Sequence, residues 1–189
     1  MKSAVWVVAV ALLASGAASA AVVNFDDLSG SGAVADGYGG INWGGVWTYY
    51  DSPQPPYTPS SGLERVYTPG TGSGEYTFSF VTPDQLFNGA WFAGTDTTTV
   101  EFNLYNDGSL VWTSASLGTT STPTFLSSGY SGAVDVVGVF SNANDFYVMD
   151  DVTYGGDVTA APEPATMSLV LVSLVGLGVL RRRAYSPQQ

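Results

Sequence analysis

Composition and charge limit what this chain can be. Its 189 residues carry 45% hydrophobic and only 11% charged side chains, include neither Cys nor His, and have a formal net charge of −11. Without Cys or His, disulfides, thiol nucleophiles, Ser-His-Asp triads and zinc sites are excluded. Residues 21–161 hold 15 carboxylates and one Arg, so this region has no basic surface with which to bind nucleic acid.

Residues 1–20 are typical of a secretory signal peptide. Lys2 precedes an apolar stretch, residues 4–14, and the small residues that follow end in Ala18-Ser19-Ala20. A charged start, a short apolar stretch and an A-x-A ending are the pattern that signal peptidase cleaves, and we expect cleavage after Ala20. The apolar stretch is well short of the ~20 residues that span a bilayer, which argues against an uncleaved anchor.

Residues 22–154 are predicted to be β-structure throughout. The clearest strand is 98–105, in which apolar and polar residues alternate, and Asn106-Asp107-Gly108-Ser109 then supplies a hairpin turn into the run 110–114. Residues 75–81 also alternate and are expected to bury their three aromatic residues, Tyr76, Phe78 and Phe80. Further strands are expected at 22–28, 46–50, 87–92, 133–140 and 146–154.

Eight or nine short strands without a helical period predict an all-β, two-sheet, jelly-roll-like sandwich over residues 21–159. One stretch interrupts the alternation, residues 51–74, with five Pro and four Gly. We expect this stretch to be a mobile surface loop.

An apolar segment lies near the carboxyl end. Residues 165–180 carry no charge and are followed at once by Arg181, Arg182 and Arg183. At ~1.5 Å per residue the segment makes about 24 Å of helix, slightly under the ~30 Å hydrocarbon core, and local thinning closes that gap. We expect a transmembrane helix at 165–180 with its arginines in the cytoplasm; a buried core helix is the alternative.

Pro162-Glu163-Pro164 stands directly before this segment. Pro-Glu-Pro, a short apolar helix and an Arg cluster together resemble the PEP-CTERM protein-sorting signal of Gram-negative bacteria, here within residues 160–189. The resemblance implies recognition of Pro162, Glu163 and Pro164 by exosortase, a membrane enzyme, and release or transfer of the protein to the outer surface or matrix. Prolines also keep such a segment extended and open to a protease. A plain spacer between domain and helix is the alternative.

Three further segments, 24–28, 38–43 and 146–154, are similar to ectodomains of many PEP-CTERM proteins and to jelly-roll carbohydrate-binding modules. In the last segment Asp150 shares a strand face with apolar residues, so its carboxylate must find backbone N–H groups or a cation. If the first and last strands lie side by side, as in jelly-roll modules, Asp26 or Asp27 would meet Asp150 or Asp151. Such oxygen ligands suit a structural Ca²⁺; a metal-free capping or turn role is the alternative.

Aromatic residues are dense near the glycines of the amino-terminal half: Tyr38, Trp43, Trp47, Tyr49, Tyr50 and Tyr57. If they are exposed they would stack on sugar rings, with Trp43, Trp47, Tyr49 and Tyr50 as the candidates; if they are buried they belong to the core. Catalysis is not expected, because Glu101 alternates outward, Glu64 lies in the Pro-rich stretch and no spacing marks a carboxylate pair.

Three functions are compatible with these features. The first is an exported structural or adhesive protein, processed by signal peptidase and exosortase, held transiently in the inner membrane and then in the outer surface, biofilm or exopolysaccharide matrix of a Gram-negative bacterium. The second is a carbohydrate-binding module that contacts exopolysaccharide. The third is a glycoside-acting hydrolase.

Overall fold

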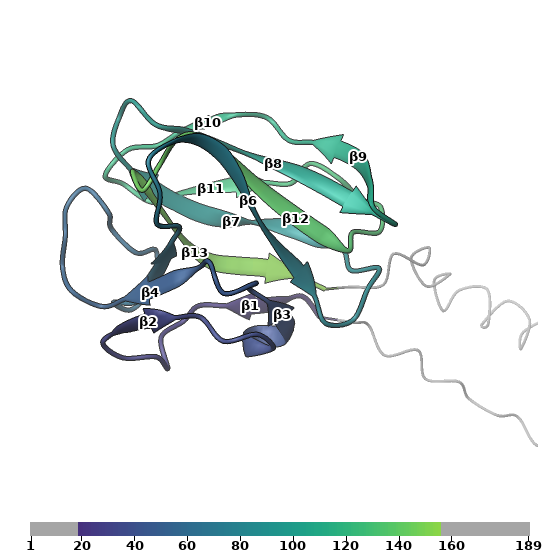
Figure 1. The fold of residues 1–189 in the computed structure, drawn as a ribbon, viewed down its shortest axis with the longest axis horizontal. Coiled ribbons are helices and arrows are strands. Elements are labelled where there is room, and N and C mark those ends of the chain that lie inside the picture. Colours follow the sequence, from purple (N-terminus) through teal and green to yellow (C-terminus); the bar gives the residue numbers. More distant parts are fainter. Residues whose placement is uncertain (1–18, 156–189) are drawn as a thin grey trace, which may run out of the picture. The chain divides into compact units, whose positions relative to one another are not determined.

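Alternating apolar side chains form β-strands along most of the chain in the computed structural model, which describes residues 19–155. These strands form two antiparallel sheets that face each other (Figure 1). The predicted Pro-Glu-Pro motif, transmembrane helix and Arg cluster lie outside the described residues, as does nearly all of the predicted signal peptide. The described residues contain no helix with the length and hydropathy that a membrane crossing requires.

The first sheet is built around β13, the last strand of the described chain. Strand β7 pairs with one edge of β13, while β5 and β1 pair with the other edge. The order across the sheet is β11 (Thr124–Ser127), β7 (Phe87–Gly94), β13 (Tyr147–Tyr154), β5 (Arg65–Tyr67), β4 (Thr48–Tyr50) and β2 (Ser31–Ala33), with β1 (Ala21–Val23) beside β13.

The second sheet is built around β8 and β12, which pair along most of their length. A 3₁₀ turn at Tyr38–Gly40 leads into one of two edge strands of this sheet that are each two residues long. The order is β10 (Leu117–Gly118), β8 (Thr99–Asn106), β12 (Val136–Asn144), β6 (Gly72–Phe80) and β3 (Ile41–Asn42), with β9 (Ser109–Thr113) beside β8.

The core lies between the two sheets and is rich in aromatic rings. The ring of Phe102 in β8 lies 4.8 Å from that of Phe87 and 5.5 Å from that of Phe92, both in β7. Phe78 and Phe80 of β6 are buried as predicted, and Tyr76 packs against the core while half-buried. The predicted all-β, two-sheet architecture is therefore confirmed.

The predicted hairpin is also confirmed. Strands β8 and β9 are joined by Asp107 and Gly108, and Asn106 pairs with Ser109. Both turn residues have positive φ, 49° for Asp107 and 73° for Gly108, which is the backbone of a type I′ turn.

The prediction of one loop over residues 51–74 is wrong in part. Strand β5 and the start of β6 lie inside that stretch. Strand β5 has three residues between Pro- and Gly-rich segments, too few to show an alternating pattern in the sequence. It forms because β4 and β13 pair with it on either side. The loop proper is 51–64.

The first and last strands do lie side by side, with Val23 opposite Val152. The predicted shared face along β13 is nevertheless wrong. Asp151 has a φ of 46°, and the register with β7 shifts between Asp150 and Thr153. This bulge reverses the alternation, so Met149 and Val152 both join the core, while Asp150 lies on the opposite, outer face.

Candidate functional site

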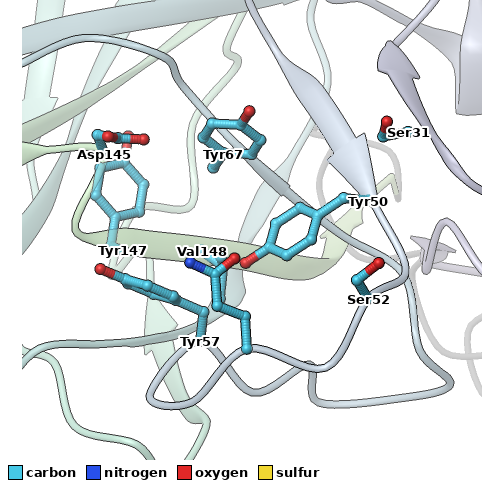
Figure 2. A pocket seen from close by; sticks show the side chains of 9 residues that line it. Ser31, Tyr50, Ser52, Tyr57, Tyr67, Asp145, Tyr147 and Val148 are labelled. Atoms are coloured by element: carbon cyan, nitrogen blue, oxygen red, sulfur yellow. The ribbon is translucent and has the colours of Figure 1, made fainter.

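A pocket of about 330 Å³ opens on the outer face of the first sheet, beside the loop 51–64 (Figure 2). Strand alternation explains why side chains reach it: Tyr50 and Tyr67 flank Tyr49 and Val66, which face the core. The strands β2, β4, β5 and β13, the loop and the β12–β13 turn supply its lining residues: Ser31, Tyr50, Ser52, Gln54, Tyr57, Tyr67, Asp145, Tyr147 and Val148. We call this the tyrosine pocket.

Three half-buried tyrosine rings surround the hollow. Tyr50 and Tyr67 meet edge to face, with ring centroids 5.4 Å apart, and Tyr57 approaches from the loop (Figure 2). Burial raises the pKa of Tyr50, against the opposing effect of Arg65. Burial and the charge of Asp145 raise the pKa of Tyr57. Both hydroxyls therefore stay protonated at neutral pH and act as donors as well as acceptors.

The polar groups of the pocket come from two sides. In Figure 2, Ser31 and Ser52 lie toward one side of the tyrosines and Asp145 toward the other. Asp145 is an exposed residue of the β12–β13 turn with a φ of 68°. No side chain or backbone N–H of the described residues donates a hydrogen bond to its carboxylate, which is therefore free to accept one from a ligand.

Arg65 holds the loop and the neighbouring tyrosine in place. Its guanidinium donates to the carbonyl oxygen of Leu63 at 2.7 Å, and also to those of Ser52 and Tyr50. Its Cζ lies 3.8 Å from the ring centroid of Tyr50, a cation–π contact. Because Ser52 and Leu63 stand at the two ends of the loop, one side chain that is only 1% exposed fixes both ends.

Asp150 anchors the middle of the same loop. Its Oδ2 accepts hydrogen bonds from the backbone N–H of Ser60 at 2.8 Å and of Ser61 at 3.0 Å. The residue is 2% exposed, and burial raises the pKa of Asp150 to about 7, although these N–H groups lower it. The prediction that this carboxylate must find partners is confirmed, and the partners are backbone N–H groups.

Three of the four predicted metal ligands, Asp26, Asp150 and Asp151, accept hydrogen bonds from Ser61. Asp26 accepts one bond from Asn24 at 3.0 Å and another from the Ser61 hydroxyl at 3.4 Å, so it lies near Asp151 as predicted. Asp27 instead accepts a hydrogen bond from the hydroxyl of Tyr38. Asp151 accepts bonds from the hydroxyls of Ser60 and Ser61, beside Asp150. In the part of the chain that the structure describes, no three acidic side chains form a group able to hold a metal ion.

Two of the predicted sugar-contacting residues belong to the core instead. Trp43 and Trp47 are both 0% exposed, and their indole N–H groups donate to the backbone carbonyls of Tyr38 and Thr77. Tyr49 packs against the core while half-buried. Of the four candidates, Tyr50 alone lines the pocket.

The remaining pocket residues were not assigned from the sequence. Tyr57 belongs to the predicted aromatic group, but nothing marked it as closer to a site than its neighbours. Tyr67 lies in strand β5, which was not predicted. Asp145 lies between two predicted strands, and this turn position was the one feature of the sequence that could have indicated a site residue there.

Comparison with known proteins leaves the chain without a family. No protein-family model matches it, and no curated protein matches it. One matching solved structure is a mutant of CBM29-2, a family 29 carbohydrate-binding module, at a TM-score of 0.44 and 9% identity over 78% of this chain and 99% of that one. Another is a GH26-CBM35 β-(1,4)-mannanase of Podospora anserina, at 0.38 and 17% over 78% of this chain and 29% of that one. At these TM-scores neither likeness carries an argument about function.

Proposed function

We propose that the domain formed by residues 19–155 binds carbohydrate in the tyrosine pocket. The observation that carries the proposal is the combination of three half-buried tyrosine rings with hydroxyl, amide and carboxylate groups around one hollow. Sugar rings present apolar C–H faces and a rim of hydroxyls, so they need aromatic surfaces and hydrogen-bonding groups together. A volume of about 330 Å³ is at the small end of the range for ligand pockets and suits one or two sugar units.

We propose binding without catalysis. Asp145 is the one carboxylate among the residues that line the tyrosine pocket. Glycoside hydrolysis by the usual route needs two, one as acid and one as base or nucleophile. The nearby Asp150 is buried beneath the loop, where it accepts the N–H groups of Ser60 and Ser61, so it is not available to a substrate.

The finer description of the fold as a jelly roll is part of this proposal. Successive strands alternate between the two sheets from β5 to β8 and again from β10 to β13. The adjacency of β1 and β13 also supports it. Long crossings of this kind are typical of the double Greek key.

The binding proposal is tested with the purified chain on an array of oligosaccharides, followed by calorimetric titration of those that bind. Replacing Tyr57 with Ala removes one of the three rings and is expected to weaken binding about fivefold or more, because stacked aromatic contacts contribute about 1 kcal/mol or more each. The control is Phe125→Ala, which removes an exposed aromatic of β11 outside the pocket and is expected to bind like the parent. Failure of every oligosaccharide to bind, or equal loss in both variants, overturns the proposal.

We also propose that the chain is exported and sorted to the outer surface or extracellular matrix of a Gram-negative bacterium. The support is the sequence of residues 1–20 and 160–189, with signal peptidase and exosortase as the processing enzymes. Glycan binding would then give the exported domain an adhesive role in exopolysaccharide. Mass spectrometry of the extracellular protein is expected to show an amino terminus at Ala21 and no Arg181, Arg182 or Arg183. An extracellular form that keeps these arginines contradicts the sorting proposal.

A further inference from the structure

The charge lining the tyrosine pocket has one sign. Asp145 is the charged residue of the lining, and its carboxylate receives no hydrogen bond from the described residues. Asp145 and Tyr57 line the same pocket, and the charge of Asp145 helps to raise the pKa of the Tyr57 hydroxyl. A ligand group placed there meets an unpartnered negative charge next to an aromatic ring.

The charged groups around the pocket do not reverse that sign. Arg65 is the one Lys or Arg among residues 19–155. It is buried, its two terminal nitrogens donate to backbone carbonyls, and its guanidinium lies over the ring of Tyr50. Asp51 accepts the N–H of Gly30 at 2.8 Å, and Asp151 accepts the hydroxyls of Ser60 and Ser61 in the loop. These carboxylates outnumber the one guanidinium.

The molecule as a whole adds to the local charge. Residues 19–155 contain 14 carboxylates and one Arg, so the potential over the surface is negative and raises the local concentration of cations. An anionic sugar such as a uronic acid is repelled, and a positively charged one is attracted. Tyrosine faces near a carboxylate are also the surroundings in which proteins hold substituted ammonium groups.

We infer that the tyrosine pocket is selective for sugars that carry a free amine, so that its ligand is a cationic amino-sugar glycan, with the ammonium group held between the Asp145 carboxylate and the ring of Tyr57. This inference rests on the proposed function. The ring of the sugar packs on the tyrosines of the pocket, and the ammonium supplies the donors that Asp145 lacks. Replacing the amine with an acetamide removes the charge and keeps the rest of the sugar.

The test compares two ligands of equal length, an oligomer of β-1,4-linked glucosamine and the same oligomer fully N-acetylated. Titration calorimetry is carried out below the pKa of the sugar amine and at low salt. We expect the amine form to bind at least tenfold more tightly than the acetylated form. The preference is expected to fall when the pH is raised above the pKa of the amine, or when salt is added, because both weaken the charge attraction.

The variant that isolates the contact is Asp145→Asn. Asn keeps the size of the side chain and tolerates the positive φ of this turn, so the fold is retained. We expect the preference for the amine form to drop about tenfold in this variant. Asp96→Asn changes the net charge equally at an exposed turn position outside the pocket and is expected to keep the preference.

The outcomes separate this inference from the function on which it rests. If Tyr57→Ala weakens both ligands while Asp145→Asn leaves their ratio unchanged, the pocket binds carbohydrate and the amine selectivity is wrong. If the acetylated form binds as tightly as the amine form, the selectivity is also wrong. If neither form binds and no other glycan binds, the proposed function fails together with the inference.

Discussion

Arg65 connects both ends of the loop that borders the tyrosine pocket to the ring of Tyr50. Its hydrogen bonds reach the carbonyl oxygens of Leu63 and Ser52, at the two ends of the loop 51–64, and its charge lies against Tyr50. A single basic residue retained in so acidic a region therefore has an internal role. It positions the loop and does not attract an anionic partner.

Replacing Arg65 with Met is expected to lower the free energy of unfolding by about 3 kcal/mol. Met keeps the apolar stem but leaves several backbone carbonyls without a donor, and each unsatisfied buried acceptor costs about 1–3 kcal/mol. Urea denaturation measures the loss, and Arg65→Lys, which keeps the charge but cannot reach both ends of the loop, should lose less. If the Arg65→Met variant is as stable as the parent protein, the loop is held by other contacts.

The raised pKa of Asp150 predicts how stability depends on pH. The carboxyl has a pKa of about 7 when folded, against a reference value of 3.8. Between these values the folded state binds a proton that the unfolded state releases, so this group's contribution to stability falls as the pH rises from about 4 to about 7. Each unit of difference in pKa is worth about 1.4 kcal/mol.

The measurement is the free energy of unfolding of the parent and of Asp150→Asn at a series of pH values. Asn does not titrate. The Asn variant is expected to be less stable at low pH because, when its amide oxygen accepts the N–H groups of Ser60 and Ser61, its NH₂ group faces the N–H of Asp151 that Oδ1 accepts in the parent. The gap between the two proteins should narrow as the pH approaches 7. Asp96→Asn is the control for net charge. A gap that widens with pH contradicts the raised pKa.

At the residue scale, the sequence predicts which side chains require a hydrogen-bond partner but not which residues provide it. Asp150 among apolar neighbours indicated a carboxylate in search of partners, and this was confirmed. Its partners, the N–H groups of Ser60 and Ser61, lie about 90 residues earlier in the chain, and no local pattern connects them. Likewise, Trp43 and Tyr50 look equivalent as aromatics near glycines, and only the packing of the two sheets makes one core and the other pocket.

At the element scale, local chemistry decided which predictions succeeded. The strand at 98–105 and the turn at Asp107-Gly108 depend on neighbouring residues alone, and both were found as predicted. The short strands β3 and β5 were missed because they form only by pairing with strands distant in sequence. The bulge at Asp151 was missed for a related reason, since it depends on the register between β13 and β7.

The β8–β9 turn offers a test of this local control. Gly108 has a φ of 73°, and a Cβ added there would meet no atom within 4 Å, so the cost of Gly108→Ala comes from the backbone conformation alone. We expect a loss of about 1 kcal/mol in the free energy of unfolding. Gly118→Ala in β10 also meets open space but has no positive φ, and it is expected to cost little or nothing. Equal losses at the two sites would mean that turn conformation is not the cause.

At the scale of the whole molecule, the excess of carboxylates opposes folding. The described residues hold 14 carboxylates and one buried Arg, and bringing like charges together in a compact domain costs free energy. The same charge that favours a cationic ligand in the tyrosine pocket therefore lowers the stability of the domain. A cationic glycan should relieve part of that repulsion when it binds, which gives the acidic composition a purpose beyond solubility.

Salt is accordingly expected to stabilise the protein without binding to it. Raising the ionic strength from about 0.01 M to 0.1 M shortens the Debye length from about 30 Å to about 10 Å. Relief of roughly 1 kcal/mol of repulsion would raise the melting temperature by about 4 °C.

Calcium is expected to have no effect beyond that of a divalent salt. Because Asp26, Asp27, Asp150 and Asp151 do not form one ligand set, CaCl₂ should raise the melting temperature no further than MgCl₂ at the same concentration. A specific effect of Ca²⁺ at micromolar concentration, reversed by chelator and lost in Asp151→Asn, would show that these carboxylates rearrange around a metal ion. Identical melting curves in the two salts would mean that Asp150 and Asp151 are held by hydrogen bonds, chiefly those from Ser60 and Ser61.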